Sequence, residues 1–342
     1  MTEPAQNGVE ILQSVDAERI RDLRRRGKFF WLDLAGLADT DLNMLSELVT
    51  IHPSALEDTR EFGQRAKLDD YQGSALLVFY GVESCSRGRP RVVEVHLHIS
   101  GDALVTVPRE PLTALAEARR HVVADPGVDR GHLLYRVLGA LAGTFLDSLE
   151  GFDDAIDSLQ EALVEHPNTV DRRRIFDLRR HLVEMHQVVI PQCDLLASSD
   201  NLFDAIPALD RNRARDQFRD VHDHLARAAG LIGSYREQLA SLLDLYISEV
   251  SNRLNETMKR LAFIATVFLP LTFITGFFGM NFGWLLNHIT PLWTFLVFGL
   301  VLLIGSAAAV VLYLRRTGLP RADRPFSIIE GCRTSTAART PT

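Results

Sequence analysis

One stripe of residues toward the C-terminal end of the chain combines small and mildly polar side chains at a regular spacing. Successive members lie alternately three and four residues apart, so in a helix they share one face. The members are Asn255, Met258, Ala262, Ala265, Leu269, Thr272 and Gly276. Small residues at this spacing suit tight packing between helices. They also suit the lining of a pore to which each of several subunits contributes one helix, and spacing alone leaves both interpretations open.

Histidine side chains are a second group of residues that could do chemistry, because histidine can bind a metal. His96 and His98 alternate along an expected strand and share one face, but no third ligand is visible nearby, so we interpret them as exposed strand histidines. His222 and His224 lie two residues apart in an expected helix and point roughly opposite ways, which argues against a shared metal. No nucleotide-binding or nucleophile motif occurs, and we expect no enzymatic activity.

An uncharged segment of 54 residues, from Leu261 to Leu314, interrupts a chain in which 24% of the residues are charged. A helix needs ~20 apolar residues to cross a bilayer core of ~30 Å. We therefore predict one span over 261–280 and a second over 292–314, joined by a short external loop. Positive residues flank both spans and are absent from the loop, which places both termini in the cytoplasm.

The part of the chain before these spans alternates strand-like and helix-like segments and then becomes helical. We predict strands over Phe29–Leu34, Ala75–Val82, Val92–Ile99 and Ala103–Val107. We predict helices over Asp41–Val49, Leu112–Val123, Leu133–Val164 and Val170–Ile190, the last of them stopped by Pro191.

A second heptad stripe precedes the first one along the chain. It consists of Val221, Leu225, Ala228, Ile232, Tyr235, Leu239, Leu242 and Tyr246. An amphipathic helix within a bundle would produce this spacing. No helix breaker separates the stripe from the first predicted span, however, so we expect one helix from about Asn212 to Phe278, roughly 100 Å long at ~1.5 Å per residue. Such a helix would connect the soluble part with the membrane.

The fold class that follows is an α/β cytoplasmic domain with a long helical stalk and two transmembrane helices. The expected organisation, in chain order, is a flexible N-terminus (1–27), the α/β domain (28–130), a helical hairpin (131–210), the stalk (211–260), the first span (261–280), the external loop (281–291), the second span (292–314) and a disordered cytoplasmic tail (315–342).

The segment from Asn255 to Asn281 resembles the first membrane span of the CorA family of divalent-cation channels. The resemblance rests on Met258-Lys259, Phe268-Leu269-Pro270-Leu271-Thr272, Gly276 and Gly279-Met280-Asn281. Three segments of the soluble part are also similar to the family pattern, namely His52–Asp58, Gln64–Tyr71 and Phe218–His224. About residues 28–316 follow the pattern, which implies a funnel-shaped homopentamer.

The resemblance implies a selectivity filter at Gly279, Met280 and Asn281. Mg²⁺ gives up its waters reluctantly, and a ring of Asn281 amides can hold the hydrated ion by accepting hydrogen bonds from its waters. A helix C-cap is a second role that suits this asparagine. The resemblance also implies pore-lining or gating positions at Asn255, Met258, Leu261, Leu269, Thr272 and Gly276.

In the family, paired acids between neighbouring cytoplasmic domains bind Mg²⁺ and hold the channel closed. Position by position this implies Asp58 and Asp220 here, with Glu57 as a nearby contributor. Carboxylate oxygens are suitable hard ligands, and solvated acids are the ordinary alternative. The sequence departs from the family pattern in having no acid in the external loop, and Gly139 stands where some relatives have a second sensing acid.

The function that these features favour is Mg²⁺ uptake through the inner membrane, driven by the membrane potential, with Co²⁺ and Ni²⁺ as further candidate ions. A proton-coupled Zn²⁺ transporter of ZntB type is the alternative on the same scaffold, and a non-conducting coiled-coil scaffold is a third. The net charge of −7 argues against a nucleic-acid partner. The expected partners are the lipid bilayer and further copies of this chain.

Overall fold

The computed structural model describes residues 9–34, 39–71, 73–83, 90–125, 127–165, 172–197, 211–280, 293 and 296–316. The chain divides into two compact units, Met1–Ile247 and Ser248–Thr342. Helix α9 (Arg211–Phe278) contributes residues to both units.

The first unit is built around a six-stranded mixed sheet with the strand order β1-β2-β6-β5-β4-β3. The strands are β1 (Glu10–Leu12), β2 (Phe30–Asp33), β3 (Lys67–Tyr71), β4 (Ser74–Glu83), β5 (Arg91–Ser100) and β6 (Ala103–Pro108). Strands β1, β2 and β6 pair in parallel, and β6, β5, β4 and β3 pair antiparallel. Alternate side chains of the central strands therefore point to two different apolar layers.

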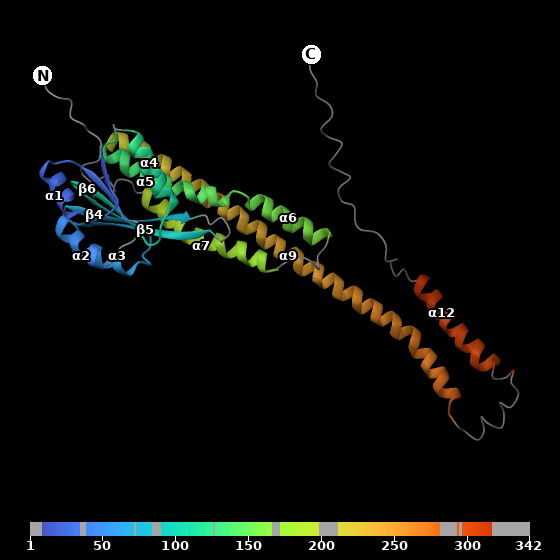
Figure 1. Cartoon of the computed structure of the whole chain (residues 1–342). Coiled ribbons are helices and arrows are strands. Elements are labelled where there is room, and N and C mark those ends of the chain that lie inside the picture. Colours follow the sequence, from blue (N-terminus) through green and yellow to red (C-terminus); the bar gives the residue numbers. More distant parts are fainter. Residues whose placement is uncertain are drawn as a thin grey trace, which may run out of the picture. The chain divides into compact units, whose positions relative to one another are not determined.

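Helices cover both faces of this sheet (Figure 1). The side of α1 (Ala17–Arg25), α2 (Asp39–Leu48) and α3 (Pro53–Glu61) contains two smaller apolar clusters. The opposite side contains the main core, to which the remaining helices contribute. These helices are α4 (Thr113–Ala124), α5 (Arg130–Leu149), α6 (Phe152–Glu165), α7 (Arg172–Ala197) and the first part of α9.

Two helical side chains complete the edge of β4 beyond the end of β3. The register of β3 reaches only as far as Val78 on β4. Past this point the backbone N–H of Tyr80 donates to Oε1 of Gln192 on α7 at 2.9 Å, and that of Val82 donates to Oγ1 of Thr144 on α5 at 2.8 Å. The two contacts satisfy strand donors that have no neighbouring strand.

The structure confirms the expected strands and most of the expected helices, but it corrects the N-terminal segment. Within 1–27, which we predicted to be flexible, β1 pairs with β2 and α1 packs Ile20 and Leu23 into the core. The α1 helix begins after Asp16, whose carboxylate accepts the N–H groups of Glu18 and Arg19 at 3.1 Å. A short parallel edge strand produces too weak a pattern to be read from sequence.

Two predicted helix boundaries are also wrong. The helix predicted over 133–164 is divided into α5 and α6, because the chain turns at Gly151, which has φ +82°. The helix predicted to stop at Pro191 continues through this proline to Ala197. Burial of Val189 before the proline and of Leu196 after it holds the helix together despite the lost hydrogen bond.

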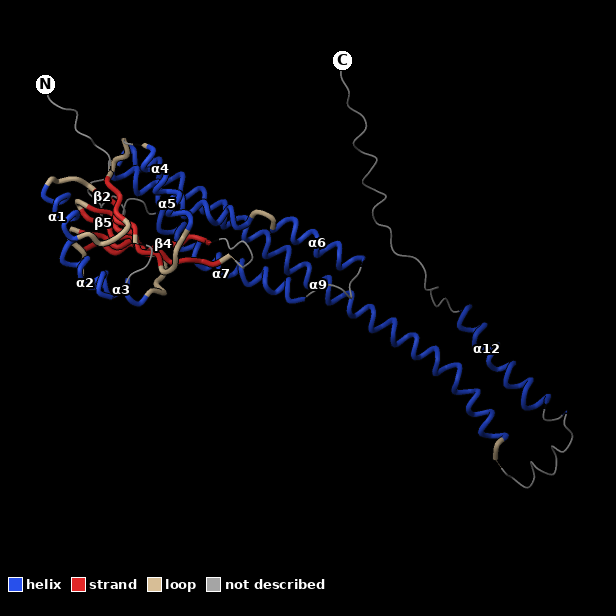
Figure 2. Tube along the Cα trace, viewed as in Figure 1, coloured by secondary structure: helices blue, strands red, loops and turns tan. Residues whose placement is uncertain are grey.

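Helix α9 confirms the prediction of one long helix, and its 68 residues run to Phe278 through Pro270 without a loop (Figure 2). In the first unit its heptad stripe is buried in the main core, where an amphipathic bundle helix belongs. The buried members are Val221, Leu225, Ala228, Ile232, Tyr235, Leu239 and Leu242.

The second unit contains the apolar end of α9 together with the π-helical turn η1 (Leu296–Val301) and α12 (Leu302–Arg316). In the described part of the chain α9 is the one helix that is long and apolar enough to cross a membrane, and a shorter apolar helix covers Gly299–Val310. Parts of the second predicted span, 292–314, lie outside the described residues, as do the whole of the predicted external loop, 281–291, and almost all of the tail.

Candidate functional site: the apolar end of α9 and the acids of the α/β domain

All members of the C-terminal stripe of α9 are exposed in the single chain. Met258, Leu261 and Leu269 have exposed fractions of 61%, 67% and 75%. The hydroxyl of Thr272 donates to the carbonyl oxygen of Phe268 at 2.8 Å. Its proton is thereby committed to the helix, so its oxygen is left to accept hydrogen bonds, for example from the water of a hydrated cation.

The helix ends at the residues that the resemblance assigns to a filter. Gly279 N–H donates to Thr275 O at 2.9 Å, and Met280 N–H donates to Phe277 O at 3.3 Å. A Cβ on Gly279 would lie 3.1 Å from Thr275 O, which leaves little room for a side chain. The last carbonyls of a helix lack helical donors and form the negative end of the macrodipole, which favours cations. Asn281 lies outside the described residues.

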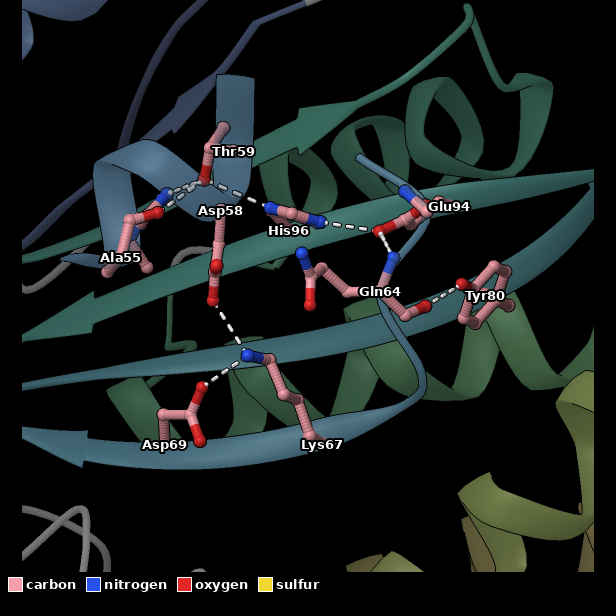
Figure 3. A network of polar contacts seen from close by, with 11 residues as sticks. Ala55, Asp58, Thr59, Gln64, Lys67, Asp69, Tyr80, Glu94 and His96 are labelled. Atoms are coloured by element: carbon pink, nitrogen blue, oxygen red, sulfur yellow. Dashed lines mark hydrogen bonds and ion pairs between the residues drawn. The ribbon is translucent and has the colours of Figure 1, made fainter. Parts of the chain in front are cut away.

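The first proposed regulatory acid, Asp58, lies on α3 and is already paired. The ammonium of Lys67 on β3 lies 2.7 Å from Asp58 Oδ2 and 2.8 Å from Asp69 Oδ2 (Figure 3). Burial would lower the pKa of Lys67, but its hydrogen bonds to Asp58 and Asp69 outweigh burial and raise that pKa, so the ammonium stays charged. Glu57, the neighbour of Asp58, is exposed.

The second proposed regulatory acid, Asp220, lies on α9 and is exposed. The hydroxyl of Tyr135 on α5 donates to Asp220 Oδ2 at 2.9 Å, and Nε2 of His224 lies 3.9 Å from Oδ1. Burial and the negative charge of Asp220 both raise the pKa of Tyr135, which therefore remains a hydrogen-bond donor.

The chemistry of these acids fits Mg²⁺, because carboxylate oxygens are the hard ligands that this ion prefers. One chain, however, brings few such ligands together at a single point. Among the residues that the structure describes, no group of three or more His, Cys, Asp or Glu side chains is placed to hold a metal ion. An ion bound at Asp58 or Asp220 would therefore keep several waters or receive further ligands from another copy of the chain.

A buried polar network, which sequence analysis missed, fixes α3 on the sheet (Figure 3). Oγ1 of Thr59, next to Asp58, lies 2.9 Å from Nδ1 of His96 and 2.9 Å from Nε2 of His98. Nε2 of His96 lies 2.8 Å from Oε1 of Glu94. The prediction that both histidines are exposed is wrong, because they are 0% and 3% exposed and α3 covers their face of β5.

The proton pattern of this network follows from its donors. The Thr59 hydroxyl donates its one proton to Ala55 O at 2.9 Å, so both histidine nitrogens must donate to it. His98 is neutral because burial lowers its pKa to about 3, and its proton therefore sits on Nε2. His96 contacts Thr59 through Nδ1 and Glu94 through Nε2, so it connects α3 with the acid on β5.

The chain between α3 and β3 completes the network. Phe62 and Gly63 adopt positive φ values of 47° and 86°, and the turn they form directs the N–H groups of Gly63 and Gln64 at the Glu94 carboxylate, at 2.5 and 2.9 Å. Burial alone would raise the pKa of Glu94, but hydrogen bonds from His96 and from these two backbone groups lower it. The end of α3 is thus tied to a charged acid on β5.

The structure combines an α/β domain with a helix whose apolar end is long enough to cross a membrane, and the comparisons specify the class of protein. Residues 26–316 match the family described as "CorA-like Mg2+ transporter protein". The chain is 30% identical over 287 residues to the cobalt/magnesium transport protein CorA of Thermotoga maritima, covering 80% of this chain and 79% of that protein.

One further relative and one solved structure are also similar to this chain. The zinc transport protein ZntB of Pectobacterium atrosepticum is 22% identical over 292 residues, covering 84% of this chain and 88% of that protein. The solved structure of the CorA magnesium transporter from Methanocaldococcus jannaschii is similar in fold, with a TM-score of 0.74 and 22% identity over 84% of this chain and 90% of that one. The chain belongs to the CorA-like family of divalent-cation transporters.

Proposed function

We propose that this chain conducts Mg²⁺ into the cell through the inner membrane, as a homo-oligomer driven by the membrane potential. The observation that carries the proposal is the stripe of small and mildly polar residues on α9. The sequence Gly279-Met280-Asn281 follows directly after this helix. A cation that follows this stripe would meet hydroxyl and amide oxygens, and at its outer end the negative pole of the helix.

The pore needs several copies of the chain, because two spans cannot enclose a channel alone. Within the part of the chain that the structure describes, every member of the stripe is exposed, and even Leu269 is 75% exposed. Lipid would not favour Thr272 and Gly276 over larger apolar residues, whereas a closed ring of helices accommodates them. By resemblance we place five copies in the ring, with the second spans around it.

The filter would bind a hydrated ion. Removing the waters of Mg²⁺ costs much free energy, so a filter that holds the hydrated ion is favoured. Carboxylates at the filter would bind the ion too tightly to release it. A ring of Asn281 amides, together with carbonyl oxygens of Gly279 and Met280, accepts hydrogen bonds from the ion's water shell and lets the ion pass on. The same coordination suits Co²⁺ and Ni²⁺, which we expect to compete with Mg²⁺.

The gate would be formed by apolar constrictions at Met258, Leu261 and Leu269, which close by losing their water. Asp58 and Asp220, with Glu57 nearby, would bind cytoplasmic Mg²⁺ between neighbouring domains and hold the constrictions narrow. When cytoplasmic Mg²⁺ falls, this contact is lost, and the helices that carry the stripe are free to move apart.

Uptake into proteoliposomes tests the proposal. Purified full-length protein is reconstituted with an internal Mg²⁺ indicator and an inside-negative potential, and uptake is compared between wild type, Asn281→Ala and Asn287→Ala. The second variant removes the same amide from the same loop. We expect uptake in wild type and in Asn287→Ala and at least a tenfold loss in Asn281→Ala. Wild-type uptake in Asn281→Ala would contradict the filter assignment.

The similarity to a zinc transport protein makes Zn²⁺ the second candidate ion. The same liposomes distinguish the two ions when a pH gradient is imposed or omitted. A passive Mg²⁺ channel conducts without the gradient. Zn²⁺ entry that requires the gradient, with Mg²⁺ excluded, would establish the alternative function on the same scaffold.

A further inference from the structure

The ammonium of Lys67 contacts one carboxylate oxygen of Asp58, the acid to which the proposed function assigns a regulatory cation. Its Nζ lies 2.7 Å from Asp58 Oδ2 on α3 and 2.8 Å from Asp69 Oδ2 on its own strand (Figure 3). Both distances are those of charge-assisted hydrogen bonds. A positive charge therefore already lies beside the acid at which the proposed function places a divalent cation.

The position of Lys67 is set by the fold. Lys67 is the first residue of β3 and pairs with Val78 of β4. Asp58 is held one residue before Thr59, which the histidine network anchors to β5. With 32% of the lysine side chain and 25% of the aspartate side chain exposed, the pair is accessible to a small ion without being freely solvated.

We propose that Lys67 acts as a built-in competitor that sets the cytoplasmic Mg²⁺ concentration at which Asp58 is occupied; this inference rests on the regulatory role of Asp58 in the proposed function. A divalent cation at Asp58 must either displace the ammonium or bind beside it. Displacement costs the lysine its two hydrogen bonds, and co-binding places like charges close together. In either case Lys67 weakens Mg²⁺ binding at Asp58. The channel then closes at a higher cytoplasmic Mg²⁺ concentration than it would without the lysine.

The size of the effect follows from Coulomb's law. A unit charge ~6 Å from a divalent ion, in surroundings as polar as water, changes the binding constant about tenfold. Removal of the ammonium should therefore lower the apparent Kd for Mg²⁺ about tenfold. A purely structural ion pair would behave differently, because its loss would affect folding stability and leave the Mg²⁺ affinity unchanged.

The chain contains a matched control for this substitution. Lys28 is exposed, lies in the same unit and can be replaced by the same residue with the same change in net charge. We compare Lys67→Gln with Lys28→Gln, with Lys67→Arg, which keeps the charge, and with Asp58→Asn, which removes the ligand. Mg²⁺ binding to the purified full-length protein is measured by isothermal titration calorimetry in detergent.

The expected result is about tenfold tighter binding in Lys67→Gln and wild-type binding in Lys28→Gln and Lys67→Arg. Unchanged binding in Lys67→Gln, when Asp58→Asn weakens binding, would overturn the role of Lys67 and leave that of Asp58 intact. Unchanged binding in Asp58→Asn would instead refute the regulatory role on which the inference rests.

Discussion

The Oγ1 atom of Thr59 lies 2.9 Å from Nδ1 of His96, a residue 37 positions later in the chain. This contact fastens the helix that carries Asp58 to the middle of the sheet. Because His98 contacts the same hydroxyl from the same strand, the attachment has two buried points. The acid that we propose as a Mg²⁺ sensor thus lies on a helix that two buried contacts attach to the sheet.

The burial of His98 predicts how stability depends on pH. Its pKa is about 3 in the folded protein and about 6.5 when unfolded. Between these values the unfolded chain binds the additional proton, so stability is complete above about pH 6.5 and falls by up to about 1.4 kcal/mol per pH unit below it. The lowered pKa of Glu94 acts in the same direction at a lower pH.

Thermal unfolding of the full chain between pH 7 and 4 measures this dependence. We expect the melting temperature to fall with pH, and the slope to flatten in His98→Asn, whose side chain does not titrate. His121→Asn is the control, because this exposed histidine on α4 loses the same titratable group without burial. Equal slopes in wild type and His98→Asn would contradict the buried neutral histidine.

Substitution of Gly279 tests whether the end of α9 positions the proposed filter. An added Cβ would lie 3.1 Å from the carbonyl oxygen of Thr275, so Gly279→Ala should displace the backbone that leads to Asn281. We expect Mg²⁺ uptake to fall at least fivefold without loss of protein from the membrane. Gly305→Ala is the control, because a Cβ there meets nothing within 4 Å. An equal effect of both substitutions would show that Gly279 has no special role.

Leu269 tests the apolar gate. A polar side chain at this position would stabilise water in the constriction and hold it open, so Leu269→Asn should conduct at cytoplasmic Mg²⁺ concentrations that close the wild-type channel. Leu269→Met keeps the apolar character and a similar volume and should still close. The measurement is uptake at high internal Mg²⁺, and closure of Leu269→Asn at the wild-type concentration would argue against dewetting at Leu269.

The features that could be predicted from sequence are those in which residue types recur at a regular spacing along the chain. Heptad spacing and the lack of charge from Leu261 onward were sufficient to predict α9, and alternation with turn residues was sufficient for four strands, β2, β4, β5 and β6, but not for β3. The environment of Asp58 could not be predicted in this way. Lys67 lies nine residues from Asp58 on another element, and His96 and His98 are buried only because α3 covers β5. Contacts between elements have no period, so sequence gives no direct signal for them.

The most direct test of the account asks which side of α9 faces a water-filled pore. After replacement of Cys85, Cys193 and Cys332, cysteine is introduced either at Thr272, on the stripe, or at Phe273, one position away and 73% exposed in the single chain. Mg²⁺ uptake is followed before and after a charged, membrane-impermeant thiol reagent is added. We predict that the reagent blocks uptake through Thr272→Cys and leaves Phe273→Cys unaffected. Block at Phe273→Cys with none at Thr272→Cys would contradict a pore lined by the stripe.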